Sequence, residues 1–86
     1  ETGPPYPGML LRVGSRGDNV LLMQQYLNVI SNIHTDIPKL TADGIFGHRT
    51  QSAVVAFQKQ FGLSVDGIIG PTTWARIVEE YMKVTN

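Results

Sequence analysis

A nine-residue pattern occurs twice in the chain, 23 residues apart, and it restricts the possible fold more than any other feature. The first copy is ADGIFGHRT at residues 42–50, and the second is VDGIIGPTT at residues 65–73. Aspartate, glycine, isoleucine, glycine and threonine stand at the same places in both copies. A stretch with helical periodicity follows each copy, so the sequence predicts a duplicated loop-and-helix unit.

The residue types of the repeat suit a turn that leads into a helix. Glycine after aspartate accepts a positive φ without steric cost. We expect the second glycine of each copy at a helix N-cap, with the aspartate carboxylate folded back toward the free amides of the first turn. Ile45 and Ile68 are expected to point inward, and Thr50 and Thr73 to donate to a loop carbonyl or carboxylate. These roles give every shared residue of the repeat a structural purpose.

Three stretches carry apolar residues at helical spacing. The first is expected to start at Ser15, with Asp18 completing a variant of the capping box. The second should follow Gly47 and end at Gly62, and the third should start at Pro71. The apolar positions are Val20, Met23, Leu27 and Ile30, then Ala53, Val54, Phe57 and Phe61, then Trp74, Ile77, Val78 and Tyr81. The predicted fold class is all-α, a compact three-helix bundle with duplicated Asp-Gly-x-x-Gly-x-x-Thr loop-helix units.

The segments outside these helices set the expected domain boundaries. Residues 1–8 contain GPPYPG and are predicted to be a linker or a cloning remnant, either a disordered connector or an arm laid over the domain. Residues 9–86 are predicted to form the domain. Residues 33–41 lose the helical period and are expected to form an ordered loop anchored by Ile37 and Leu40.

Composition excludes several classes of function. Seven basic and seven acidic side chains give a formal charge of zero, so no positive field favours nucleic acid. No apolar run is long enough to suggest a membrane partner. The absence of cysteine excludes thiolate metal sites and a cysteine nucleophile. His34 and His48 are the only histidines and fit no zinc spacing. We therefore predict no catalytic residue, no metal site and no cofactor.

Longer motifs around the repeat resemble a known family. LRVGSRGDNVLLMQQYLN, ADGIFGHRTQSAVVAFQKQFGL and VDGIIGPTTWARI together resemble the peptidoglycan-binding domain of bacterial cell-wall hydrolases, over about Leu11 to Ile77. The resemblance implies a three-helix fold with duplicated units. The implied function is attachment of an amidase, an endopeptidase, a lytic enzyme or a spore-cortex hydrolase to peptidoglycan. The stretch from Ser31 to Leu40 departs from the family pattern and is expected to reshape the rim of a binding groove.

The same resemblance implies where the protein works and with what. The module is expected to be non-catalytic, monomeric and fused to a catalytic domain. Its location is expected to be secreted or cell-wall associated, the spore cortex included. Its predicted partner is peptidoglycan, through either the stem peptide or the glycan.

The first loop is the predicted ligand site. The start of the second helix presents free amides, and Arg49 adds a fork suited to a carboxylate. Phe46, which replaces Ile69 of the other copy, is expected either to form an apolar wall for the ligand or to anchor the loop. Trp74 is expected in the core rather than on a ligand platform. The predicted ligand-binding residues are Asp43, Gly44, Phe46, Gly47, His48, Arg49 and Thr50.

Other functions of modules with duplicated loops or three helices fit the residues less well. A dockerin-like calcium module needs oxygen ligands around each Asp-Gly pair, and neither loop supplies the set. An inhibitory metalloprotease prodomain needs a cysteine, and a helix-turn-helix DNA binder needs positive charge. The alternative function is a protein-interaction or inhibitory prodomain-like module on the same fold. Peptidoglycan cleavage by the isolated domain would overturn the non-catalytic reading.

Overall fold

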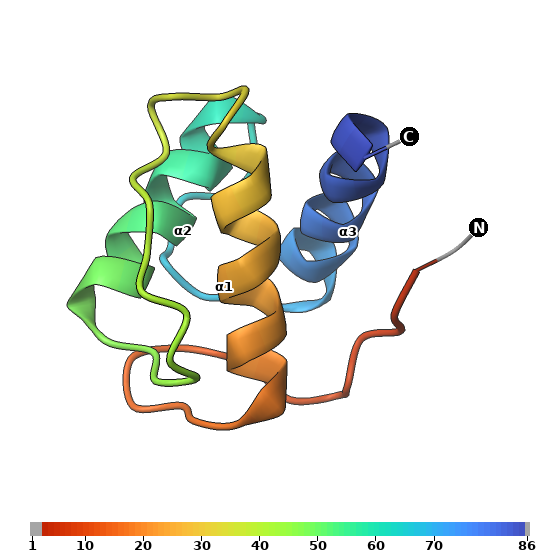
Figure 1. Ribbon diagram of the computed structural model, residues 1–86. Coiled ribbons are helices and arrows are strands. Elements are labelled where there is room, and N and C mark those ends of the chain that lie inside the picture. Colours follow the sequence, from red (N-terminus) through yellow and green to blue (C-terminus); the bar gives the residue numbers. More distant parts are fainter. Residues whose placement is uncertain (1–2, 86) are drawn as a thin grey trace.

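The computed structural model describes residues 3–85 and consists of three helices joined by loops (Figure 1). The helices are α1 (Asp18–Ile30), α2 (His48–Gln60) and α3 (Pro71–Thr85). Within the described residues no strand forms, but isolated antiparallel bridges join Leu11 to Ile69 and Arg16 to Ile45. The predicted all-α fold class is therefore confirmed. None of the three helices is long and apolar enough to cross a membrane.

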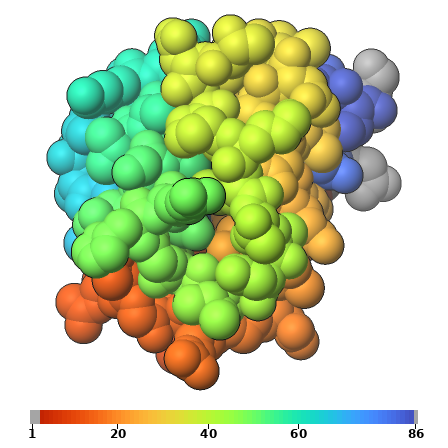
Figure 2. Space-filling model, turned by 60° about the vertical axis from the view of Figure 1, so that its left-hand side comes forward, coloured from red at the N-terminus to blue at the C-terminus, as the bar shows by residue number. Residues whose placement is uncertain are grey.

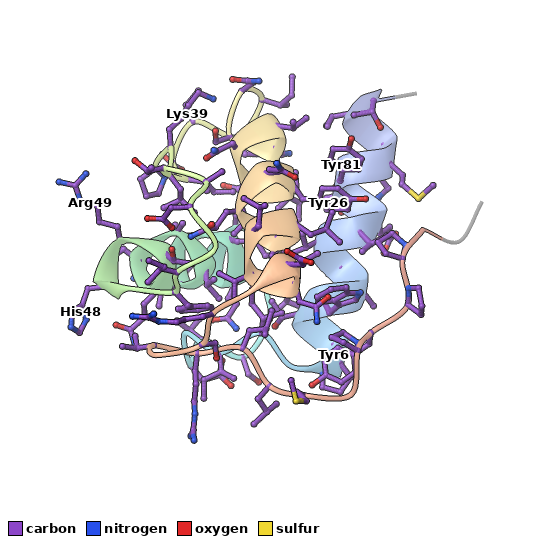
Figure 3. The ribbon with its side chains drawn as sticks, turned by 60° about the horizontal axis from the view of Figure 1, so that its bottom comes forward. Tyr6, Tyr26, Lys39, His48, Arg49 and Tyr81 are labelled. Carbon is purple, nitrogen blue, oxygen red and sulfur yellow. The ribbon has the colours of Figure 1, made fainter. Side chains whose placement is uncertain are left out.

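The core lies between α1 and its two neighbours. α1 packs mainly against α3 and less extensively against α2. Tyr26 and Tyr81 stack face to face across the α1–α3 contact, with ring centroids 3.7 Å apart (Figure 3). The predicted apolar positions are buried or packed against the core, and Trp74 is among the buried ones. The periodicity of the sequence therefore identified the inward face of each helix.

The start of α1 differs from the prediction. α1 begins at Asp18 with Gly17 at the N-cap, and no side chain caps it. Ser15 Oγ instead accepts a hydrogen bond of 3.0 Å from the amide of Arg12, so the serine closes the preceding turn. Gly17 has a φ of 121°, a conformation that side chains strongly disfavour. The predicted capping box at Ser15 is therefore wrong.

The expected boundaries of α2 are confirmed. Gly47 occupies the N-cap position, directly before the first helical residue. Gly62, two residues beyond the end of the helix, has a φ of 70°, as expected for a left-handed cap.

The segment between α1 and the first loop is held firmly against α1. Ile37 is buried in the core, as expected. The amide of Leu40 donates to Asn28 Oδ1 over 2.7 Å, and Asn28 Nδ2 donates to the carbonyl of Leu40 over 2.8 Å. Lys39 Nζ donates to the carbonyl of Asn28 (3.1 Å) and to Ser31 Oγ (2.9 Å), which places a positive charge at the carboxyl end of α1.

The proline-rich segment at residues 3–8 lies along α3 (Figure 1). Trp74 Nε1 donates a 3.0 Å hydrogen bond to the carbonyl of Pro4. The Tyr6 ring meets Trp74 edge-on, with centroids 5.9 Å apart. These contacts bring the segment onto the domain surface, while the division of the chain after residue 8 stays a prediction.

Candidate functional site

The first loop is built around a buried glutamine of α1. Gln24 Oε1 accepts from the amides of Asp43 (3.0 Å) and Gly44 (2.8 Å). Gln24 Nε2 donates to the carbonyl of Ile45 (2.9 Å), to Thr50 Oγ1 (3.0 Å) and to Asp43 Oδ1 (3.2 Å). One side chain therefore fixes the whole turn and ties it to the first turn of α2.

The second loop repeats these contacts with a glutamine of α2. Gln58 Oε1 accepts from the amides of Asp66 (3.1 Å) and Gly67 (3.0 Å). Gln58 Nε2 donates to the carbonyl of Ile68 (3.1 Å), to Thr73 Oγ1 (3.2 Å) and to Asp66 Oδ1 (2.9 Å). The duplicated unit is therefore a helix, a loop and the next helix, with the glutamine in the first helix.

Sequence reasoning did not assign this role to the two glutamines. Both follow a large buried residue, in the pairs Met23–Gln24 and Phe57–Gln58, which is a signal that the sequence carries. However, Gln24 lies 19 residues before its aspartate, whereas Gln58 lies eight residues before the equivalent one. The longer connection after α1 therefore hides the repeat of the glutamine.

The two aspartates close the loops and do not cap the helices. Asp43 Oδ1 accepts from the amide of Ile45, and Asp66 Oδ1 accepts from the amide of Ile68, each over 3.0 Å. These backbone hydrogen bonds, followed by those from the glutamine side chains, hold the pKa of both carboxyl groups below the usual range. No side chain caps α2, so the predicted contact between Asp43 and the helix amides is wrong.

The threonines and isoleucines of the repeat also differ from expectation. Thr50 and Thr73 accept hydrogen bonds from the glutamines, where donation had been predicted. Ile45 is 46% exposed, whereas the next residue, Phe46, is only 1% exposed. The Phe46 amide and carbonyl pair with Ser15 and Gly14 of the preceding segment, which fixes Phe46 toward the core.

The burial of Phe46 decides between its two predicted roles. Its side chain anchors the loop from inside the domain and cannot form an apolar wall for a ligand at the surface. We therefore remove Phe46 from the candidate contact surface.

A cleft of about 280 Å³ lies at the first loop. Five of the seven predicted ligand-binding residues line this cleft. The other two, Gly44 and Phe46, are buried. His48 and Arg49 project from the start of α2 toward solvent (Figure 3). Arg49 forms no ion pair within residues 3–85. The lining residues, which we call the first-loop cleft, are Leu40, Thr41, Asp43, Ile45, Gly47, His48, Arg49 and Thr50.

The second loop forms a corresponding cleft of about 340 Å³ with different chemistry. Pro71 and Thr72 stand where the first loop has His48 and Arg49. No basic side chain lines this second cleft, and Leu10 and Leu63 make part of its wall apolar. The two clefts share a scaffold, but the first alone combines it with a cation suited to a carboxylate.

Comparisons with known proteins agree with this arrangement. A family model described as a peptidoglycan binding domain matches residues 16–77. The N-acetylmuramoyl-L-alanine amidase CwlL of Bacillus licheniformis is 39% identical over 66 residues, which cover 77% of this chain and 18% of the amidase. The spore cortex-lytic enzyme of Halalkalibacterium halodurans is 33% identical over 76 residues, which cover 88% of this chain and 22% of that enzyme.

The fold also matches a crystal structure, that of the SleB N-terminal domain. The TM-score is 0.75 at 29% sequence identity, and the match covers 88% of this chain and 97% of that chain.

Three helices with two glutamine-centred loops define a small all-α binding module. The chain belongs to the peptidoglycan-binding domain family. It spans only about a fifth of the curated hydrolases that it matches, 18% and 22% of their lengths. In those hydrolases the matched region is therefore one module of a larger enzyme, and the predictions that this chain belongs to the peptidoglycan-binding domain family and is a binding module are confirmed.

Proposed function

We propose that this domain attaches a cell-wall hydrolase to peptidoglycan through the first-loop cleft. It works as a monomer at the cell wall, outside the cytoplasm, in a chain that also carries a catalytic domain. Two of the curated relatives are an amidase and a spore cortex-lytic enzyme, which supports a hydrolase of this general kind.

The observation that carries the proposed site is the position of Arg49. Arg49 lies in the first turn of α2, whose free amides carry partial positive charge, and its side chain projects toward solvent (Figure 3). It forms no ion pair with a carboxylate of residues 3–85, although Asp43 lines the same cleft. A carboxylate of the ligand would complete this site with charge-assisted hydrogen bonds.

Among the two parts of peptidoglycan, the stem peptide fits the first-loop cleft better than the glycan. The stem peptide carries carboxylates, which suit Arg49 and the amino end of α2. Because Phe46 is buried, no Phe, Tyr or Trp ring lines the cleft, and a sugar would find only the smaller imidazole ring of His48 to stack on.

A sedimentation assay with insoluble peptidoglycan tests the proposal. The unaltered domain should pellet with the cell-wall material. Arg49→Ala should weaken binding about tenfold, because it removes one charge-assisted hydrogen bond. Thermal unfolding of Arg49→Ala should change by less than about 0.5 kcal/mol, because the side chain is exposed. Amidation of the stem-peptide carboxylates should weaken binding of the unaltered domain as well.

Arg12→Ala is the matched control, because Arg12 is an exposed arginine outside the first-loop cleft. It should bind like the unaltered domain. Equal binding by Arg49→Ala and Arg12→Ala would remove Arg49 from the site. Failure of the unaltered domain to pellet would overturn the proposed function.

A further inference from the structure

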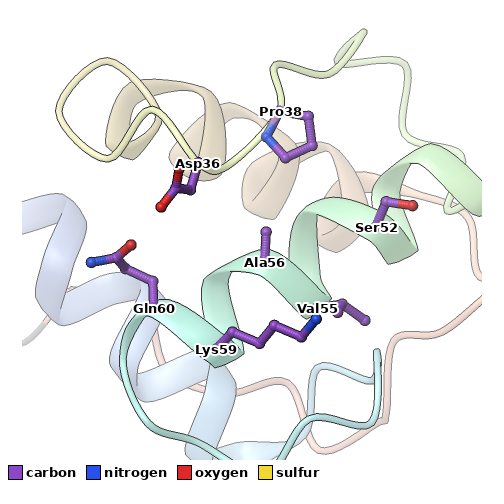
Figure 4. Close-up of a pocket in the computed structure, with 7 residues that line it drawn as sticks. All are labelled: Asp36, Pro38, Ser52, Val55, Ala56, Lys59 and Gln60. Carbon is purple, nitrogen blue, oxygen red and sulfur yellow. The ribbon is translucent and has the colours of Figure 1, made fainter.

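The first-loop cleft continues as a groove along α2. A hollow of about 240 Å³ adjoins the cleft and shares Leu40 and Arg49 with it. A larger hollow of about 570 Å³ shares Pro38 and Ser52 with the smaller one and extends toward the carboxyl end of α2 (Figure 4). In Figure 2 the surface is hollowed between the yellow-green segment and α2.

We call this continuation the α2 groove. One wall is the segment before the first loop, and the other wall is α2. Its lining residues are Asp36, Pro38, Lys39 and Leu40 on the segment, and Arg49, Ser52, Val55, Ala56, Lys59 and Gln60 on α2.

The walls of the α2 groove are held in place without a ligand. Ile37 is buried in the core beneath the segment, and Leu40 is fixed to Asn28 of α1 by two hydrogen bonds. Lys39 is tied to the end of α1. A ligand would therefore enter a preformed site and would not have to order the segment, which favours affinity.

The dimensions of the α2 groove suit an extended peptide. Gln60 lies eleven positions after Arg49 on α2, a rise of about 16 Å at about 1.5 Å per residue. An extended chain of about five residues covers the same length at about 3.3 Å per residue. On the α2 wall, the small side chains of Ser52 and Ala56 leave room for a peptide backbone (Figure 4).

The wall before the first loop offers backbone groups to such a peptide. Residues 38–42 have neither helix nor turn, and both backbone groups of Leu40 bond to Asn28 on α1. In an extended segment, the amide and carbonyl of one residue point to the side opposite to those of the adjacent residues. Within residues 3–85 the amides of Lys39 and Thr41 have no hydrogen-bond acceptor, so they are available to a peptide that pairs along this edge.

The charges of the α2 groove favour an acidic ligand. α2 contains Arg49 near one end, Lys59 near the other and no acidic residue. Neither cation forms an ion pair in the part of the chain that the structure describes. Asp36 supplies the one carboxylate of the groove. The local excess of positive charge contrasts with the zero net charge of the whole chain.

We propose that the α2 groove binds the stem peptide of peptidoglycan as an extended acidic chain, with carboxylates near Arg49 and Lys59. This inference rests on the proposed function, because it extends the first-loop cleft. It adds that recognition covers several residues of the stem and that Lys59 and Asp36, at the far end, adjust its strength.

Titration calorimetry with a synthetic acidic stem peptide at low salt tests the inference. Lys59→Gln should weaken binding about threefold, because it removes an attraction at the protein surface. Asp36→Asn should tighten binding about twofold, because it removes a like charge. Lys83→Gln is the matched control on α3 and should leave the affinity unchanged. All three side chains are exposed, and thermal melts should verify that each variant remains folded.

The possible failures of the two proposals can be separated. If the domain pellets with peptidoglycan in an Arg49-dependent way but Lys59→Gln and Asp36→Asn bind the peptide like the unaltered domain, the inference about the α2 groove is wrong and the proposed function stands. Competition by a peptide-free glycan fragment, with no binding of the stem peptide, would also overturn the inference. Loss of all binding to peptidoglycan would overturn the proposed function itself.

Discussion

Gln24 and Gln58 supply hydrogen-bond partners for the backbone of the two loops, as neighbouring strands do in a sheet. Each amide group accepts from two backbone amides and donates to a backbone carbonyl, so the loop needs no pairing partner at these positions. Both side chains are 1% exposed, so they are shielded from competing water. Hydrogen bonds in such a setting are costly to break, because the partners remain buried.

Replacing either glutamine should therefore destabilise the fold strongly. Gln24→Ala or Gln58→Ala leaves two backbone amides without their acceptor, and we expect each to lower the free energy of unfolding by about 3 kcal/mol or more. Gln25→Ala is the control, because Gln25 is the exposed neighbour on the same helix, and it should cost less than about 0.5 kcal/mol. Urea unfolding measures all three variants. Similar losses for Gln24→Ala and Gln25→Ala would contradict the structural role of the buried glutamine.

The carboxylates of Asp43 and Asp66 should make stability sensitive to acid. Their pKa values are lowered in the folded state by the amides of Ile45 and Ile68 and by the two glutamines. The unfolded chain therefore takes up these protons first as the pH falls. The contribution to stability is complete above the unfolded pKa and is lost as the pH falls through the folded pKa.

Neutralising both carboxyl groups should flatten this response. The double variant Asp43→Asn, Asp66→Asn is expected to lose less of its melting temperature than the unaltered domain between about pH 5 and pH 2. Melting curves recorded by circular dichroism across this range measure the difference. Parallel curves for the two proteins would show that other groups control acid stability.

At the level of elements, periodicity predicted the three helices and their inward faces. Apolar side chains at helical spacing are sufficient for this, because burial of one face stabilises each helix. The start of α1 was predicted three residues too early, because Ser15 Oγ accepts from the amide of Arg12 and does not cap the helix. A serine before a helix is compatible with either contact, and only the path of the chain decides between them.

The candidate site was harder to predict than the helices. The sequence located the first loop, and the structure forms a cleft there. The inward residue was misplaced by one position, because the pairing of Phe46 with Ser15 and Gly14 fixes which side chains turn inward. That pairing joins segments far apart in the sequence and has no local signal.

One wall of the α2 groove is the stretch after α1, and its place in the site could not be predicted from the sequence alone. The stretch after α1 was identified as a departure expected to reshape a groove, but its sequence alone does not say what it would face. Its anchors, Ile37 and the Asn28–Leu40 pair, place it opposite α2. The groove is therefore a tertiary feature of two segments that are separate in the chain.

At the scale of the whole molecule, the two equivalent loops form two clefts with one architecture and different chemistry. The segment before α1 supports both, since Leu11 pairs with Ile69 of the second loop and Gly14 pairs with Phe46 of the first. The first-loop cleft and the α2 groove carry Arg49 and Lys59, whereas no basic side chain lines the second cleft. We expect ligand binding to be confined to the face of the first loop and α2.

Amide NMR of the isotopically labelled domain tests this central claim most directly. During titration with soluble peptidoglycan fragments that carry stem peptides, the shifts of residues 38–50 and of the groove side of α2 should change in a saturable way. Residues 63–73 at the second cleft, built on the same scaffold, should change little. Changes centred on residues 63–73 or on the α1–α3 surface would contradict the account.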